Sequence, residues 1–302
     1  MNQEQLLNVM RRWSVRVDRA LNRFMVRDRV EPAVVHKAMR YSVFAGGKRL
    51  RPFLCLSAAE ICGGQPERVM PAACALEVLH TYSLVHDDLP AMDDDDLRRG
   101  RPTNHKVFGE GMAILAGDGL LTYAFQLLAE NALVPGVKAE RVVDAVRGVA
   151  RAAGSLGMVG GQAMDLMSEE SPARGPERAR ILNFIHRRKT GALIKASLDA
   201  GAVLAGGTPA RRRALARYGE EIGLAFQIAD DVLDIVGDKK LLGKRGSDRD
   251  NGKLTFPAVY GLGESRRRAA RAVARAKDAL SLFGKKAAAL SALADYIIER
   301  DR

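Results

Sequence analysis

Apolar residues recur at a spacing near 3.6 residues through most of the chain, in segments of roughly 15 to 30 residues, which is typical of amphipathic helices in a bundle. Alternation of β-branched and polar residues, the pattern of a strand, is rare. Segments with glycine, proline or clustered polar residues separate the helical stretches: 62–66, 134–136, 168–176, 206–209 and 237–253. Because these breaks are evenly spread, the pattern predicts an all-α protein with one helical domain over residues 1–302.

The composition agrees with a helical protein that has a large core, since 47% of the 302 residues are hydrophobic. The longest uninterrupted apolar runs, such as 112–116, are far shorter than the roughly 20 residues of a spanning helix, so we expect no membrane span. The N-terminal segment lacks the apolar stretch of a signal peptide, and we expect a cytoplasmic protein. Cys55, Cys62 and Cys74 have no CxxC spacing, which indicates core residues rather than disulfides or zinc ligands.

The net charge of +12 is compatible with nucleic acid, anionic lipid or phosphorylated small molecules as partners. Basic residues concentrate in 11–29, 211–213 and 266–277. The second and third of these segments lie among alanines with helical spacing and no interleaved aromatic residues, which favours solvated helix faces over a nucleic-acid surface. We therefore expect no nucleic-acid partner.

Two acidic clusters carry the candidate chemistry. The first belongs to HDDLPAMDDDDLRRG, residues 86–100, and follows a helix predicted from about residue 71 to residue 89. On this helix His80, Asp87 and Asp88 share one face, because they lie at positions i, i+7 and i+8. If this cluster stood alone, a solvated acidic turn would be the alternative interpretation.

The second cluster lies in a predicted helix over residues 219–234. Its polar positions at i, i+3, i+4 and i+7 are Gln227, Asp230, Asp231 and Asp234. Its opposite, apolar side is expected to carry Ile228, Val232, Leu233 and Ile235. Carboxylates so close together on a buried face need a cation or raised pKa values, and oxygen ligands without cysteine favour magnesium with substrate phosphates. Two such clusters indicate a metal and diphosphate site.

The spacing of residues excludes a calcium-binding EF-hand loop and a P-loop. An EF-hand loop starting at Asp93 would need glycine and glutamate where Arg98 and Asn104 stand. The sequence Gly46-Gly47-Lys48 lacks the first glycine and the final Ser or Thr of a P-loop. These glycines can nevertheless bring backbone N–H groups and the neighbouring basic side chains close to an anion.

The ordered set of motifs resembles the trans-isoprenyl diphosphate synthase family. The set comprises GGKRLRP (46–52), DDLPAMD (87–93) with Arg98 and Arg99, GGQAMDL (160–166), KTG (189–191), FQ with DDVLD (226–234), GKRGSD (243–248) and GKLTFP (252–257). It spans residues 46–257, most of the chain. The resemblance implies an isoprenoid synthase fold, a single large helical bundle around a central active-site cavity. A terpene cyclase usually carries a different second metal motif.

The resemblance also implies roles for individual residues. Three Mg²⁺ ions would be held by Asp87, Asp88, Asp93, Asp230, Asp231 and Asp234, with Asp87, Asp93 and Asp230 as direct ligands. The allylic diphosphate would be bound by Arg98, Lys189, Lys244 and Lys253. Isopentenyl diphosphate would be bound by Lys48, Arg51, His80 and Arg99. Asp94, Asp95 and Asp96 have no assigned role beyond solvation or support of the arginines.

The implied reaction is ionisation of an allylic diphosphate, attack by isopentenyl diphosphate and loss of a proton to the released diphosphate. Lys189 would bind that diphosphate while Thr190 and Gln227 stabilise the allylic cation. Gln162 and Asp165 would orient a lysine or a metal-bound water.

The residues just before the first motif bear on product length. Tyr82 and Ser83 lie about 6 to 7.5 Å along the helix from Asp87. The family resemblance implies that an aromatic residue at this depth stops chain growth. The resemblance is closest to the bacterial enzymes that make farnesyl diphosphate (C15), and geranylgeranyl diphosphate (C20) is the alternative. A homodimer is expected from the family, and a non-catalytic basic helical subunit is the alternative from another class.

Overall fold

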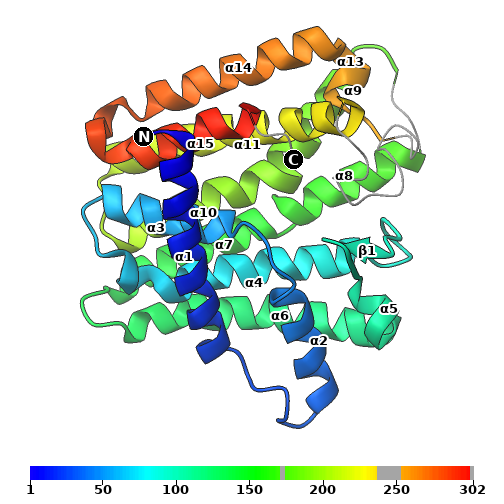
Figure 1. Cartoon of the computed structure of the whole chain (residues 1–302), viewed down its shortest axis with the longest axis vertical. Coiled ribbons are helices and arrows are strands. Elements are labelled where there is room, and N and C mark those ends of the chain that lie inside the picture. The colour runs from blue at the N-terminus through cyan, green and yellow to red at the C-terminus, as the bar shows by residue number, and fades with distance from the viewer. Residues whose placement is uncertain (171–173, 237–252, 300–302) are drawn as a thin grey trace.

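The computed structural model describes residues 1–170, 174–236 and 253–299. These residues are almost entirely helical, which confirms the all-α prediction (Figure 1). The α-helices are α1 (Gln3–Phe24), α2 (Ala33–Val43), α3 (Leu50–Ile61), α4 (Met70–Asp87), α5 (Asn104–Phe108), α6 (Glu110–Glu130), α7 (Ala139–Ala153), α8 (Met158–Glu170), α9 (Glu177–Ile185), α10 (Ala192–Leu204), α11 (Pro209–Val236), α13 (Phe256–Tyr260), α14 (Leu262–Ala279) and α15 (Ala288–Glu299).

Shorter elements join these helices. Three are 3₁₀ turns, η1 (Pro66–Val69), η2 (Asn131–Leu133) and η4 (Ser281–Ala287), and η3 (His186–Gly191) is a π-helix between α9 and α10. The described residues also include a two-stranded antiparallel ribbon, β1 (Leu97–Arg98) and β2 (Arg101–Pro102). The sequence pattern did not predict this ribbon, because each strand is only two residues long and too short to show alternation.

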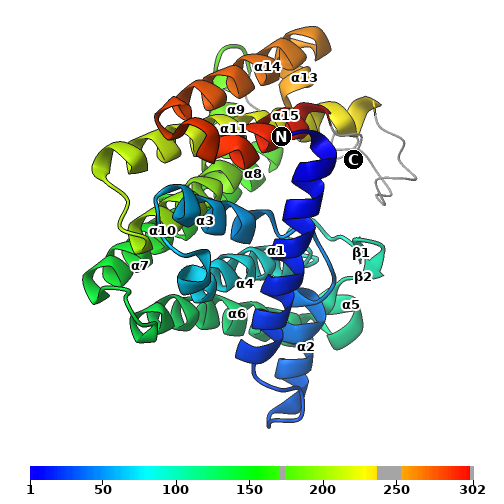
Figure 2. The ribbon, with the colours of Figure 1, turned by 60° about the vertical axis from the view of Figure 1, so that its left-hand side comes forward.

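Two large clusters of buried side chains form most of the core, and α3 and α10 contribute to both. The first cluster joins them to α4, α6 and α7, and the second joins them to α11, α14 and α15. Figure 2 shows these helices in successive rows, with α1 running across them. Where α3 meets α10, a Cβ at Gly201 would lie only 2.0 Å from the Cys55 carbonyl oxygen, so this crossing requires glycine.

The cysteine prediction is confirmed, since Cys55, Cys62 and Cys74 are all buried free thiols. Burial raises the pKa of Cys55 to about 12 and that of Cys62 to about 11, which keeps both thiols protonated.

One segment among the described residues, Glu110–Leu133, is long and apolar enough by composition to cross a membrane. The short uninterrupted runs in the sequence did not reveal it, because a few polar residues interrupt the stretch. In the structure, α6 packs along α4, and Ala113, Ala116 and Leu120 are completely buried in the first core cluster. One face of α6 therefore belongs to the core.

A buried ion-pair network fixes the start of α3. Arg49 adopts a left-handed backbone conformation (φ 48°) and is only 4% exposed. Its guanidinium donates to Asp18 Oδ1 of α1, Glu77 Oε1 of α4 and the Val43 carbonyl of α2, each at 2.8 Å. Burial opposes the charge of Arg49, but Glu77 and Asp18 outweigh it and raise the Arg49 pKa. One side chain thus connects four helices around the Gly46-Gly47 turn.

We expect Glu77→Ala to lower the free energy of unfolding by about 3 kcal/mol, because it leaves the buried Arg49 with an incompletely neutralised charge. Thermal or denaturant unfolding followed by circular dichroism measures this loss. Arg16→Ala, which breaks the exposed Arg16–Glu67 ion pair, is the control and is expected to change stability by less than about 1 kcal/mol. Equal losses in the two variants would contradict a structural role for the buried network.

Candidate active site

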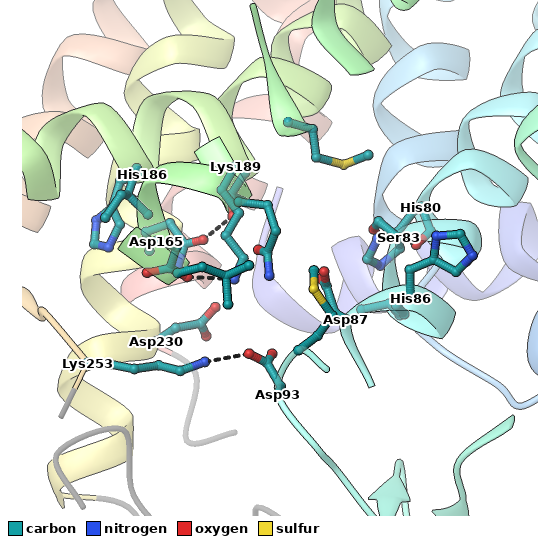
Figure 3. Close-up of a pocket in the computed structure, with 18 of the residues that line it drawn as sticks. His80, Ser83, His86, Asp87, Asp93, Asp165, His186, Lys189, Asp230 and Lys253 are labelled. Atoms are coloured by element: carbon teal, nitrogen blue, oxygen red, sulfur yellow. Dashed lines mark hydrogen bonds and ion pairs between the residues drawn. The ribbon is translucent and has the colours of Figure 1, made fainter. Parts of the chain in front are cut away.

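A cavity of about 700 Å³ opens between α4, α8, η3 and α11. Figure 3 shows Asp87 and Asp93 on one side of it, with Asp230, Lys253, Asp165 and Lys189 across from them. The predicted site residues that line the cavity are Arg51, His80, Tyr82, Ser83, Asp87, Asp93, Arg98, Lys189, Thr190, Gln227, Asp230, Asp231, Asp234 and Lys253. Asp88, Lys48 and Arg99 do not line it. Lys244 lies outside the described residues.

The first acidic motif begins where α4 ends and the chain turns at Pro90. The turn is closed by the Asp93 N–H, which donates to the Asp87 carbonyl at 2.9 Å and so brings both carboxylates to the same wall. Asp88 points elsewhere: it is 3% exposed and accepts from Arg98 Nε at 2.9 Å. Asp88 is therefore the partner that orients Arg98 rather than part of the cavity wall.

Two of the aspartates without an assigned role also form ion pairs. Asp95 accepts from Arg98 Nη2 at 2.9 Å, so it supports the same guanidinium as Asp88. Asp96 pairs with Lys106 at 2.8 Å on the protein surface. The acidic run thus divides into cavity-facing carboxylates and carboxylates that hold basic side chains.

The carboxylates fit a magnesium ion that binds together with a diphosphate. Within the described ranges, no three His, Cys, Asp or Glu side chains converge closely enough to hold a metal ion by themselves. Burial raises the pKa of Asp87 to about 6, although Lys189 opposes the shift. A carboxylate in this environment is stabilised by a cation beside it, and magnesium commonly combines one or two carboxylates with waters and phosphate oxygens.

Two lysines reach the cavity through ion pairs. Lys189 Nζ lies 2.7 Å from Asp165 Oδ2, and Lys253 Nζ lies 2.9 Å from Asp93 Oδ1. Burial opposes both charges, but the neighbouring carboxylates outweigh it and raise the pKa of each lysine. Both side chains are therefore cationic at neutral pH and can bind an anion between the two acidic motifs.

Lys189 and Thr190 owe their position to η3. A π-helix places one extra residue in a turn, and such bulges are frequent at functional sites. The turn packs against α8 at Gly161, where a Cβ would lie 2.2 Å from the Lys189 backbone nitrogen. Thr190 Oγ1 donates to Gln227 Oε1 of α11, so the two side chains expected to face an allylic cation do meet.

The second acidic motif lies near the end of α11, where Asp230, Asp231 and Asp234 all line the cavity. Asp231 also accepts from the Phe256 N–H at 2.8 Å, which ties α13 to α11. The expected apolar side of this helix is only half right. Ile228 and Val232 are buried as predicted, but Leu233 lines the cavity and Ile235 is 47% exposed, because the core ends before the last turn of α11.

Basic side chains gather beside the Gly46-Gly47 turn. Arg51 and His80 line the cavity, and burial, followed by the charge of nearby Arg51, lowers the pKa of His80 well below its usual value. Burial also lowers the pKa of Arg51 to about 10. Arg51 Nε and His80 Nδ1 are buried without a hydrogen-bond partner among the described residues, which suits a bound anion.

The other two side chains predicted for this anion lie outside the cavity. Arg99 donates to the Gly46 carbonyl, and its guanidinium occupies the space that a Cβ at Gly47 would fill. Lys48 is exposed, with its ammonium 5.6 Å from the ring centroid of Tyr296 on α15.

Tyr82 also lines the cavity, and its side chain is largely buried, at 8% exposed. Its ring stacks edge to face on His86, with centroids 5.3 Å apart. His86 in turn packs against Gly117 of α6, where a Cβ would lie 2.0 Å from its Nε2, and this nitrogen donates to the Ile114 carbonyl at 3.1 Å. The position of the Tyr82 ring is thus fixed by His86, which packs against α6.

Sequence reasoning missed three residues at this site: His186, Glu169 and His86. His186 lines the cavity and packs on Phe256, and Glu169 lies 3.7 Å from Lys253. The spacing of Glu169 from Asp165, i and i+4 on α8, could have revealed it. No sequence signal marks the π-helix that brings His186 inward.

Comparison with known proteins gives consistent results. A family described as polyprenyl synthetase matches residues 32–291. The chain is 46% identical over 305 residues to the farnesyl diphosphate synthase of Geobacillus stearothermophilus, covering 99% of this chain and 98% of that protein. It is also 46% identical over 286 residues to the geranylgeranyl diphosphate synthase of Cyanophora paradoxa, covering 94% and 93%.

Among solved structures, the chain is similar to an FPP/GFPP synthase from Zymomonas mobilis, with a TM-score of 0.86 and 36% identity. The match covers 97% of this chain and 99% of that one.

We expect Gly161→Ala to weaken binding of inorganic diphosphate in the presence of Mg²⁺ on the order of tenfold or more, because the new methyl group displaces the backbone of Lys189. Isothermal titration calorimetry measures the affinity, and circular dichroism verifies that the helices are retained. Gly111→Ala in α6 is the control, since a Cβ there meets no atom within 4 Å. Unchanged binding by Gly161→Ala would show that the position of η3 does not matter for the anion.

Proposed function

Because the chain belongs to the polyprenyl synthetase family, we propose that this prenyltransferase is a farnesyl diphosphate synthase. It adds isopentenyl diphosphate first to dimethylallyl diphosphate and then to geranyl diphosphate, which gives the C15 product. The observation that carries this proposal is the lining of one cavity, which combines two acidic motifs and two lysines with the aromatic ring of Tyr82, about one helical turn before Asp87 on α4. A diphosphate fits the charged part of this lining (the mouth), and an apolar chain fits the space between the mouth and Tyr82.

Asp87, Asp93 and Asp230 would hold Mg²⁺, and we expect three such ions. When bound, these ions supply positive charge that stabilises the diphosphate. Lys189 and Lys253 bind the same group and stabilise the negative charge that develops on it as the allylic C–O bond breaks. Arg98, held by Asp88 and Asp95, adds a third fixed cation at this position. Arg51 and neutral His80 bind isopentenyl diphosphate.

The carbon skeleton then reacts away from the charged mouth. The hydroxyl of Thr190 and the amide of Gln227 face the allylic carbons, where positive charge is shared between C1 and C3. The double bond of isopentenyl diphosphate attacks C1, and the proton lost from its C2 passes to the released diphosphate. His80 does not serve as the base, because it binds the second diphosphate.

Product length is the finer part of the proposal. The relative from Geobacillus stearothermophilus is named for farnesyl diphosphate and the one from Cyanophora paradoxa for geranylgeranyl diphosphate. Support for C15 comes from Tyr82, whose ring is buried, lines the cavity about one helical turn below Asp87 and is held by His86. A small residue at this position would leave space for further isoprene units.

A homodimer is also part of the proposal. Ile114 and Leu115 of α6 and Val143 of α7 are 45%, 54% and 57% exposed, and such apolar side chains are favourable at an interface between copies.

The cytoplasmic location stays a prediction.

The activity is tested by incubating the protein with isopentenyl and geranyl diphosphates and Mg²⁺, then separating the dephosphorylated alcohols by chromatography. We expect C15 farnesol as the main product and no elongation after chelation of the metal by EDTA, because the aspartates then have no cation to share with the substrate. Absence of any longer alcohol would contradict the prenyltransferase assignment, and a dominant C20 alcohol would contradict the assigned length.

Tyr82→Ala is expected to shift the products toward C20 and longer, because it removes the aromatic ring that closes the cavity. The same chromatography gives the distribution. Tyr82→Phe keeps the ring and is the matched control, with C15 still dominant. If Tyr82→Ala leaves the distribution unchanged, the chain stops at another residue.

A further inference from the structure

Gln162 lines the cavity but has no part in the reaction proposed for the other side chains. It is 9% exposed. Neither its amide oxygen nor its amide nitrogen has a hydrogen-bond partner within residues 1–170, 174–236 and 253–299. Buried amides are nearly always hydrogen-bonded, and leaving one unpaired costs about 1–3 kcal/mol per group. An amide kept in this state in the ligand-free protein is suited to a group that arrives with the substrate.

The sequence predicted that Gln162 and Asp165 both orient a lysine or a metal-bound water, and of the two it is Asp165 that contacts a lysine. Asp165, three residues later on α8, accepts from Lys189 Nζ at 2.7 Å. Gln162 makes no such contact, so its amide remains available.

The position of Gln162 along α8 indicates which part of a substrate it faces. Asp165 and Glu169 follow it toward the mouth, where Glu169 lies 3.7 Å from Lys253 and Lys253 binds Asp93. Gln162 lies about 4.5 Å before Asp165 along the axis of α8, on the side away from Glu169, since each helical residue rises about 1.5 Å. Its neighbour Gly161 touches the backbone of Lys189, which places Gln162 beside η3 and Thr190. This is the level of the first carbons of a chain whose diphosphate occupies the mouth.

We propose that Gln162 is a catalytic residue whose amide oxygen faces the allylic carbons and stabilises the cation formed on ionisation. This inference rests on the proposed function. When the C1–O bond breaks, its electron pair leaves with the diphosphate, and the positive charge is shared between C1 and C3. An amide oxygen presents its negative end to that charge without forming a bond to carbon, and at 9% exposure Gln162 is little screened by water.

An unpaired amide is better suited to this task than a paired one. A hydrogen-bond donor on Gln162 Oε1 would compete with the cation for its lone pairs, and no donor is present among the described residues. Since the neutral substrate carries no charge on these carbons, the interaction strengthens only as the bond breaks. It therefore lowers the barrier rather than tightening substrate binding.

Gln162→Met tests this role, because methionine keeps the length of the side chain and removes the amide. We expect kcat for geranyl and isopentenyl diphosphates to fall on the order of 10- to 100-fold, with each KM within about threefold of the wild type. Gln126→Met, at an exposed position on α6, is the matched control and should keep full activity.

A second measurement separates stabilisation of charge from a structural effect. A non-ionising thiolo analogue of geranyl diphosphate and a cationic ammonium analogue are compared by their inhibition constants. We expect Gln162→Met to bind the thiolo analogue as the wild type does and the ammonium analogue about tenfold or more weakly. The melting temperature of the ligand-free variant should stay equal or rise, because an unpaired buried amide is removed.

Two results would overturn the inference: unchanged kcat in Gln162→Met, or equal weakening of both analogues with a lower melting temperature, which marks a structural role. Failure of the proposed function looks different, since the wild-type protein itself would then make no longer alcohol.

Discussion

The mutual repulsion of carboxylates across one cavity is the constraint on which the rest of the structure depends. Asp87 and Asp93 come from the end of α4, and Asp230 and Asp234 from the end of α11. Close approach of these carboxylates is unfavourable without a cation between them. The bundle holds them apart through α3 and α10, which contribute to both core clusters, and so keeps open the cavity that is proposed to receive substrate and metal. The rigid packing of small residues, as at Gly201, maintains that separation.

The aspartates differ in how far basic side chains neutralise their charge, and this difference separates their roles. Asp88 and Asp93 each have a basic partner within 3 Å, Arg98 and Lys253 respectively. Burial raises the pKa of Asp87, whereas the effect of burial on Asp93 is outweighed by Lys253, Lys189 and Arg98 together, so that the pKa of Asp93 is lowered. A bound diphosphate with its metal would exchange with the lysine contacts rather than add to an empty surface. The lysine charges that now pair with aspartates would then pair with the diphosphate.

The sequence pattern correctly predicted which residues share a helix face, because this depends only on helical spacing. Asp87 and His80 line one cavity because seven residues make two turns, and Gln227 and Asp230 follow the same rule. Contacts between distant segments could not be predicted from spacing. The pairing of Asp88 with Arg98 depends on the turn at Pro90, and the outward position of Lys48 depends on Arg49 being drawn into the core by Glu77.

The positions of irregular backbone could not be predicted from the sequence either. The π-helix η3 sets where Lys189 and Thr190 point, yet it has no pattern of its own. The order of motifs along the chain still located these residues, through the family resemblance rather than through periodicity.

The support of Tyr82 by His86 and Gly117 has a consequence for evolution. The ring that is proposed to limit the product is held by a histidine that fits only because residue 117 has no side chain. A substitution on α6, outside the substrate's reach, can therefore shift His86 and with it Tyr82. If Tyr82 limits the product as proposed, related enzymes can change product length through substitutions on this neighbouring helix while every residue that binds the diphosphate stays the same.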